Sequence, residues 1–197
     1  MKHLAAMPYS QVGAFMQALR QRSDGTALAL EFVILTGART GEALGATWDE
    51  VDLRGKVWTV PAERMKAGKE HRVPLSAAAL AILQRLHQDR VSDYVFAGGK
   101  RGRPLSEMAL LMLLRRMDRA DITTHGFRSS FRDWAAECTS FPHEVCEMAL
   151  AHTVSTAVEA AYRRGDLFEK RRKLMDAWAA YCAIAGTGDV VPMRRRR

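Results

Sequence analysis

The run from Thr26 to Leu35 constrains the fold most, because it is apolar on nearly every side of a helix. Its large apolar residues are Leu28, Leu30, Phe32, Val33, Ile34 and Leu35. A helix that is apolar all round has no face for water and must be covered by other elements. The run stops at Thr36 and Gly37, and a glycine commonly supplies the left-handed residue that ends a helix. The sequence therefore predicts a central, buried helix.

Length and composition are those of a folded globular chain. It has 197 residues, of which 48% are hydrophobic, enough for one domain with extensions. No uninterrupted apolar run reaches the roughly 18 residues of a membrane span, and Met1-Lys2-His3 is not followed by a signal-type apolar core. We therefore expect a cytoplasmic protein without a membrane partner.

The three cysteines and the net charge constrain the function only weakly. Cys138, Cys146 and Cys182 are an odd number without CxxC spacing, so we expect reduced, partly buried thiols rather than disulfides or a zinc cluster. The net charge of +8 favours a polyanionic partner. Half of it comes from the terminal run Arg194 to Arg197, which is typical of a flexible tail.

Further helices are predicted where apolar residues recur every three or four positions. We expect them over residues 10–21, 76–87 and 106–115, from about Gly126, from Pro142, and over residues 166–181. Ser10, Ser76 and Ser106 are the predicted N-caps, and Asp166 with Glu169 has the spacing of a capping box.

Three short strands are predicted between these helices, over residues 51–53, 57–60 and 71–75. Arg54-Gly55 forms the first turn and Ala67-Gly68 lies in the second, so Lys66 and Lys69 lie at a hairpin tip. A solvated loop charge is the simplest interpretation of Lys66. The predicted fold class is mainly α with a small three-stranded antiparallel β-sheet.

An arginine lies between two predicted apolar helices, in Ala38-Arg39-Thr40-Gly41-Glu42. Thr40 is the predicted cap of a short helix that reaches Leu44. In this position we expect the guanidinium of Arg39 to have a binding partner. Either it pairs with Glu42 as a structural bridge or it binds an anion.

Two histidines, another arginine and a tyrosine lie further along the chain. His125 and Arg128 stand three residues apart at a predicted helix N-terminus, where the helix dipole and free N–H groups favour an anion. Tyr162 follows His152 by ten residues in an Ala-rich segment, where a packing role is the commoner one for a tyrosine. These histidines lack the carboxylate or thiolate companions of a metal site.

Two arginines with two histidines match a phosphodiester instead. Each guanidinium can donate two parallel hydrogen bonds to phosphate oxygens, which become more negative as phosphorus turns pentacoordinate. Neighbouring arginines lower the pKa of a tyrosine, and a histidine can accept its proton. A lysine on the hairpin could protonate the leaving 5′-oxygen. Such a set suits reversible transesterification.

Four motifs in this order resemble the tyrosine recombinases, also called phage-type integrases, over nearly all of residues 8–184. The motifs are 36–42 (TGARTGE), 66–75 (KAGKEHRVPL), 125–128 (HGFR), and 150–152 (LAH) followed by Tyr162. The segment 160–167 (AAYRRGDL) is similar to the branch of prophage and genomic-island integrases, whose members often insert at transfer-RNA genes. The resemblance implies the catalytic-domain fold of that family.

The resemblance also implies a role for each matching residue. Arg39 and Arg128 would clamp the phosphate, and Glu42 would orient Arg39. Lys66 would be the acid for the leaving group, with Lys69 as its rival. His125 would assist acid and base chemistry, His152 would contact the phosphate, and Tyr162 would be the nucleophile. No metal or cofactor is implied.

Two features depart from the usual family pattern. The commoner Leu-Gly-His is Leu150-Ala151-His152 here, and the interval to Tyr162 is one residue longer than in many relatives. Only about 25 residues precede the buried helix, so we expect residues 1–185 to form an isolated catalytic domain without the family's N-terminal DNA-binding domains. Such a domain should bind DNA weakly by itself. Residues 186–197 are expected to be a flexible basic tail.

The implied function is site-specific DNA recombination through a 3′-phosphotyrosyl intermediate, for integration or excision of a mobile element. The alternatives are relaxation of DNA by a type IB topoisomerase-like enzyme and a noncatalytic DNA-binding module. The implied partners are double-stranded DNA attachment sites and directionality or DNA-bending accessory proteins. The assembly would be a tetramer on DNA, with a monomer as the alternative for an isolated domain. The helix over 168–183 and the tail would exchange between neighbours, or else pack on their own domain.

Overall fold

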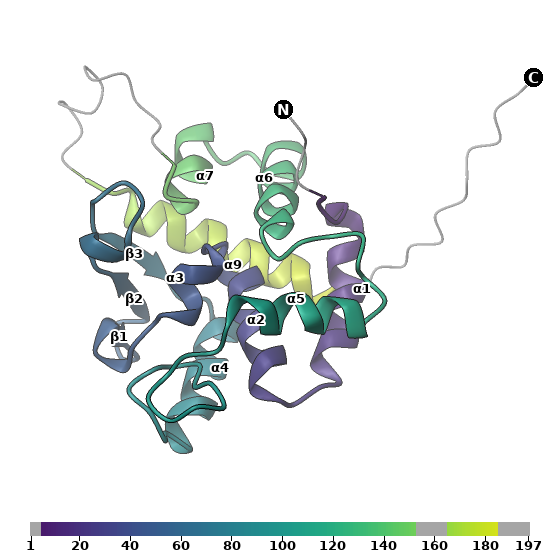
Figure 1. Ribbon diagram of the computed structural model, residues 1–197. Helices are drawn as coiled ribbons and strands as arrows, with labels where there is room; N and C mark the ends of the chain where they lie inside the picture. The colour runs from purple at the N-terminus through teal and green to yellow at the C-terminus, as the bar shows by residue number, and fades with distance from the viewer. Residues whose placement is uncertain (1–4, 153–164, 185–197) are drawn as a thin grey trace, which may run out of the picture.

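The computed structural model describes residues 5–152 and 165–184. Tyr162 and the predicted tail over 186–197 lie outside the described residues. The described part is mainly helical, with a small sheet at one side (Figure 1). The α-helices are α1 (Tyr9–Arg20), α2 (Gly25–Thr36), α3 (Thr40–Leu44), α4 (Ala77–Gln88), α5 (Glu107–Arg116), α6 (Gly126–Cys138), α7 (His143–Ala149) and α9 (Phe168–Ala183). The remaining elements are the 3₁₀ turns η1 (Trp48–Glu50) and η2 (Ala62–Arg64) and the strands β1 (Val51–Asp52), β2 (Val57–Val60) and β3 (His71–Pro74).

Helix α2 is the buried helix that the sequence predicts. Every residue from Ala27 to Thr36 is buried, and α2 contacts α1, α3, α4, α5 and α9. The Asp24 side chain caps its start by accepting hydrogen bonds from the backbone N–H groups of Thr26 and Ala27. Gly37 ends it with a φ of 62°. Arg39, which follows Gly37 by two residues, is therefore anchored by a fully packed helix.

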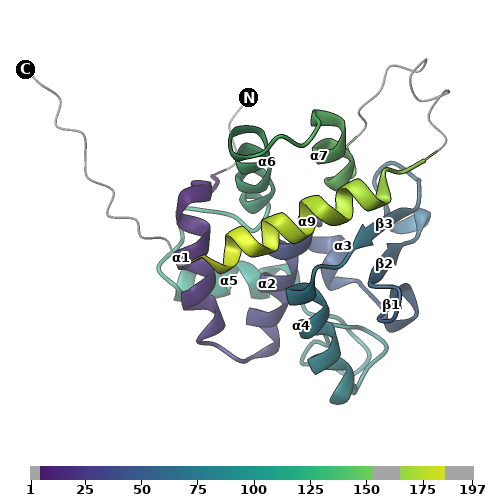
Figure 2. The same cartoon turned by 180° about the vertical axis from the view of Figure 1, so that it is seen from behind.

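Helix α9 crosses the molecule between α6 and α7 on one side and α2 and α4 on the other (Figure 2). Trp178 is fully buried within it, and its indole Nε1 donates to the carbonyl oxygen of Ile34 in α2 over 2.8 Å. The Trp178 ring also packs against Phe131 and Trp134 of α6. Helix α9 thus packs on its own chain, the second of the two arrangements considered for it.

The sheet has the order β1-β2-β3, and both pairs are antiparallel, as predicted. Trp58 in β2 pairs with Val51 and Val73 and is fully buried. Its indole Nε1 donates to Glu50 Oε2 over 2.9 Å. The connection from β2 to β3 contains η2 and then Lys66, so the sheet carries this lysine toward the helices.

Three predicted caps are wrong, and a neighbouring residue takes the position each time. Helix α1 begins at Tyr9, one residue before Ser10, and Pro8 is its N-cap. Arg39 rather than Thr40 is the N-cap of α3. Leu167, with a φ of 52°, is the N-cap of α9. The Glu169 carboxylate lies 3.5 Å from Arg172 Nε instead of completing a capping box.

The other predicted caps hold in position. Ser76 caps α4, and its hydroxyl accepts a hydrogen bond from the Ala79 N–H over 3.4 Å. Ser106 precedes α5 without a side-chain capping bond. The three cysteines are free thiols; Cys146 and Cys182 are buried, whereas Cys138 is exposed. None of the helices in the described ranges is long and apolar enough to cross a bilayer.

Candidate active site

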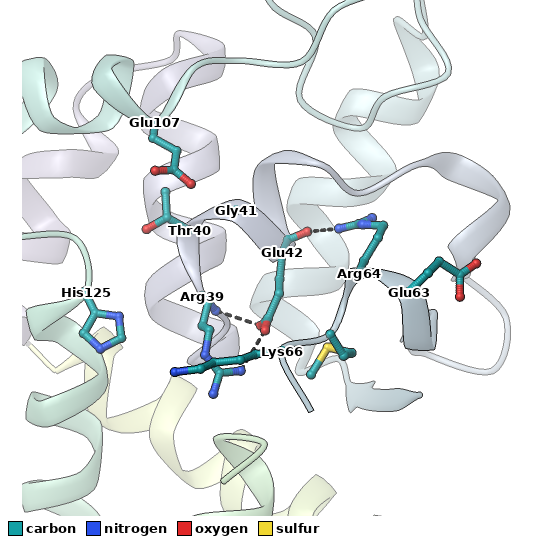
Figure 3. Close-up of a pocket in the computed structure, with 10 residues that line it drawn as sticks. Arg39, Thr40, Gly41, Glu42, Glu63, Arg64, Lys66, Glu107 and His125 are labelled. Carbon is teal, nitrogen blue, oxygen red and sulfur yellow. Dashed lines mark hydrogen bonds and ion pairs between the residues drawn. The ribbon is translucent and has the colours of Figure 1, made fainter. Parts of the chain in front are cut away.

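An open cleft of about 600 Å³ lies beside the C-terminal end of α2 (Figure 3). It brings together side chains from α3, the β2–β3 connection, α5 and the start of α6. Four of its residues are sequence-predicted site residues: Arg39, Glu42, Lys66 and His125. The others that line it are Thr40, Gly41, Glu63, Arg64, Met65 and Glu107.

Arg39 is held at the start of α3 by Glu42. The Arg39 backbone N–H donates to Glu42 Oε2 over 3.0 Å, and Nη1 donates to Oε1 over 2.7 Å. Glu42 is buried, and its two carboxylate oxygens hold both the backbone N–H and the guanidinium of Arg39. Arg39 Nη2 also lies 3.5 Å from the carbonyl oxygen of Ala151, which connects it to the segment that carries His152. The predicted pairing with Glu42 is present, and three of the five guanidinium N–H groups remain for an anion.

Lys66 reaches the cleft from the β2–β3 connection, whereas Lys69 does not line it (Figure 3). Arg64 fixes the base of this connection. It donates to the carbonyl oxygen of Gly45 and to Glu50 Oε1, each over 2.6 Å, and to the carbonyl oxygen of Glu42. The carbonyl groups of Glu42 and Gly45 lie at the C-terminal end of α3, where backbone carbonyls lack hydrogen-bond partners within the helix. Arg64 thereby links the β2–β3 connection, which carries Lys66, to α3, whose N-cap is Arg39.

Arg128 lies in the first turn of α6, three residues after His125, and is only 4% exposed. Its Nη1 donates to the carbonyl oxygen of Gly37. Its Nη2 donates to the Leu150 carbonyl oxygen over 2.7 Å and lies 3.0 Å from His152 Nε2. Burial and the charge of Arg39 lower the pKa of Arg128 to about 10, so it stays charged at neutral pH. Three of its five N–H groups have protein acceptors, which leaves two for a phosphate.

His125 precedes α6 and faces the cleft. Burial lowers the pKa of His125 below its ordinary value, and the positive charges of Arg128 and Arg39 lower it further. The imidazole is therefore neutral near pH 7 and able to accept a proton.

His152 follows the end of α7 and contacts Glu147 of that helix. His152 Nδ1 lies 2.8 Å from Glu147 Oε2, and its backbone N–H donates to the Glu147 carbonyl oxygen over 3.0 Å. Glu147 Oε1 also accepts from Arg132 Nε. Ala151, just before His152, has a φ of 51°, a left-handed conformation that favours glycine. This explains why Leu-Gly-His is the commoner form of the motif.

The structure therefore brings Arg39, Lys66, His125, Arg128 and His152 together, with Glu42 behind Arg39. Tyr162, the sixth predicted residue, lies outside the described residues. Glu147 and Arg64 were not predicted. Glu147 precedes His152 by five residues across a helix end, a spacing without a known pattern, and Arg64 resembles any charged residue of a hairpin loop.

Comparison with known proteins agrees with this arrangement. The sequence profile of the phage integrase family matches residues 6–167. Prophage integrase IntA of Escherichia coli (strain K12) is 33% identical over 195 residues, which cover 96% of this chain and 47% of IntA. The chain thus spans about half the length of the curated relatives it matches.

Solved structures share the fold at low identity. The Tn1549 transposon integrase in complex with circular intermediate DNA matches with a TM-score of 0.62 and 16% identity, over 89% of this chain and 66% of that chain. A lambda integrase tetramer bound to a Holliday junction matches with a TM-score of 0.60 and 20% identity, over 80% of this chain and 49% of that chain. These matches confirm the predicted tyrosine recombinase fold. Together with the family match over most of its length, they show that the chain belongs to the phage integrase family of tyrosine recombinases.

Proposed function

We propose that residues 1–185 form the catalytic domain of a site-specific DNA recombinase that integrates or excises a mobile element. One observation carries this proposal: two arginines, two histidines and a lysine from four separate segments converge beside the end of α2. No requirement of packing explains so many cationic groups at one place, because like charges repel and their burial is costly. A bound phosphodiester would offset both costs.

Arg39 and Arg128 clamp the two nonbridging oxygens of the scissile phosphate. Each is already held by the protein, Arg39 by Glu42 and Arg128 by backbone carbonyls, and each keeps N–H groups for a ligand. Such preorganised donors need little rearrangement as charge builds on the oxygens. The clamp therefore favours the pentacoordinate transition state over the tetrahedral ground state.

The reaction exchanges one phosphodiester for another. The Tyr162 hydroxyl attacks phosphorus and forms the 3′-phosphotyrosyl bond, while the bond from phosphorus to the 5′-oxygen breaks. The tyrosine proton passes to His125, whose lowered pKa keeps it neutral at physiological pH. Lys66, which lines the same cleft from the β2–β3 connection, gives a proton to the departing 5′-oxygen. The reverse steps, with a 5′-hydroxyl from another strand, rejoin the DNA.

Solved structures of relatives on DNA support the proposed DNA partner and assembly. Double-stranded attachment sites are the substrate, and a tetramer on DNA is the working assembly. Directionality or DNA-bending proteins that assist it are proposed from the family resemblance alone. The lambda integrase homologue forms a tetramer on a Holliday junction. In the described residues, α9 packs on its own chain, so an exchange between neighbours would use residues after it.

A suicide DNA substrate that carries the attachment site tests the proposal. Full-length protein should form a covalent adduct with one strand, and Tyr162→Phe should form none. Absence of an adduct with the wild-type protein would contradict the proposed chemistry. Relaxation of plasmids of arbitrary sequence by a monomer would instead indicate a topoisomerase.

A further inference from the structure

The Glu147 carboxylate of α7 contacts His152, which follows the end of the same helix. The Glu147 side chain is 15% exposed and lies 2.8 Å from His152 Nδ1 through Oε2. Its Oε1 accepts from Arg132 Nε and lies 3.7 Å from His143 Nε2. The backbone bond from His152 N–H to the Glu147 carbonyl makes a second link. His152 is therefore attached to Glu147 at its ring and at its main chain.

The contact between His152 and Arg128 determines which ring nitrogen carries the proton. A guanidinium can only donate hydrogen bonds, so His152 Nε2, 3.0 Å from Arg128 Nη2, must be the acceptor. The single proton of the neutral ring then lies on Nδ1. That nitrogen points at Glu147 Oε2, which can only accept when ionised. Both contacts require the same tautomer.

A bound phosphate would change what Nε2 must do. Phosphate oxygens accept hydrogen bonds, so His152 can contact one only when Nε2 also carries a proton, that is, as imidazolium. The charges that face His152 are of both signs. Arg128 and His125 of the α6 region and Arg39 of α3 disfavour a positive charge on His152. Glu147 of α7 favours that charge. Arg132 and His143 face Glu147 rather than the His152 ring.

We propose that Glu147 is a positioning residue that keeps the proton of neutral His152 on Nδ1 and stabilises the imidazolium form when a phosphate is bound. The inference rests on the proposed function for its second half only. Burial raises the pKa of Glu147, but hydrogen bonds from His152 and Arg132 lower it, and the net pKa lies below its ordinary value. The carboxylate is thus ionised at neutral pH and able to neutralise the histidine charge.

Imidazole ¹⁵N resonances of the full-length protein without DNA test the first half. His152 is assigned by the signal lost in His152→Gln. We expect the Nδ1–H tautomer in the wild-type protein. Glutamine has one acceptor oxygen, which cannot serve both His152 Nδ1 and Arg132 Nε, so Glu147→Gln should show a smaller share of this tautomer. Asp133→Asn, which removes an exposed charge from α6, should leave the share unchanged.

An Nε2–H tautomer in the wild-type spectrum would overturn the inference, and this measurement does not need the Glu147→Gln variant to fold. An unchanged share of the Nδ1–H tautomer in Glu147→Gln would overturn it as well.

The pH dependence of strand cleavage on the suicide substrate tests the second half. If the imidazolium form is needed, the cleavage rate falls as pH rises, and this fall should lie at lower pH in Glu147→Gln, which lacks the stabilising carboxylate. At the alkaline end of the profile the variant would be about tenfold slower than the wild-type protein. A profile that matches Asp133→Asn would contradict the inference. A wild-type protein that forms no adduct at any pH would contradict the proposed function, while the tautomer measurement would still decide the role of Glu147.

Discussion

The guanidinium of Arg128 donates a hydrogen bond to the carbonyl oxygen of Gly37, the residue that ends α2. Gly37 has a φ of 62°, and a Cβ placed on it would lie 3.3 Å from Leu150 Cδ2. Leu150 in turn offers its carbonyl oxygen to Arg128. The end of the buried helix and the chain before His152 therefore hold the same arginine.

Gly37→Ala should destabilise the fold by about 1–2 kcal/mol, because an alanine is strained in the left-handed region. The added methyl would also press on Leu150 and shift the carbonyls that hold Arg128. Urea unfolding gives the change in the free energy of unfolding. Gly99→Ala is the control: no atom lies within 4 Å of its added Cβ, and we expect a change within about 0.5 kcal/mol. Equal effects of the two variants would contradict this account of Gly37.

Arg128→Lys should slow covalent adduct formation by about 100- to 1,000-fold. A lysine has three donors on one nitrogen and cannot serve the two carbonyls, His152 and a phosphate as a planar guanidinium does. Single-turnover cleavage of the suicide substrate measures the effect, with circular dichroism to verify the fold. Arg101→Lys, in the exposed turn before Pro104, should cleave at the wild-type rate. Wild-type cleavage by Arg128→Lys would refute the clamp.

His71 should make the fold less stable as the pH falls from 6.5 toward 4. Burial, with the charge of Arg171, lowers the pKa of His71 from 6.5 to about 4. Between these values the unfolded chain binds a proton that the folded chain does not, so the free energy of unfolding decreases as pH decreases. His71 contributes at most about 1.4 kcal/mol per pH unit to this slope.

His71→Gln removes that contribution, and unfolding in urea at pH 7, 6 and 5 compares the slopes. The variant should lose less stability than the wild-type protein over this range. Parallel slopes would mean that His71 is protonated as readily in the folded state as in the unfolded one.

Arg64→Met should cost about 3–5 kcal/mol, because it leaves the carboxylate of Glu50 buried without its cationic partner. The Glu50 side chain is 8% exposed and would keep only the hydrogen bond from Trp58. Adding Glu50→Gln should recover part of the loss, since a neutral amide is less costly to bury. A double-mutant cycle by urea unfolding measures the coupling. Additive effects, within about 0.5 kcal/mol, would show that the two side chains do not depend on each other.

Much of the fold could be predicted because its elements carry local patterns. The apolar run of α2, the glycine after it and the three short strands are all set by neighbours in sequence. The cap positions were less predictable. Arg39 caps α3 because Glu42 turns back to its N–H, and Leu167 caps α9 in a left-handed conformation that its residue type does not favour.

The candidate site also contains residues that the sequence predicts and residues that only the structure reveals. Arg39, His125, Arg128 and His152 belong to motifs with fixed local order, so they could be named from the sequence, and the structure brings them together. Glu147 and Arg64 act across helix ends and loops, and only the folded structure reveals their partners. Arg171 is similar: it lies in the basic run of α9, yet it is 1% exposed and donates to the Asp166 and Arg72 carbonyls.

Covalent capture of DNA tests the central claim most directly. Full-length protein is incubated with a suicide substrate that carries the attachment site, and the adduct is digested and mapped by mass spectrometry. We predict a single 3′-phosphotyrosyl linkage on Tyr162, which Tyr162→Phe abolishes while DNA binding persists. A linkage on another residue, or an adduct that survives Tyr162→Phe, would contradict it.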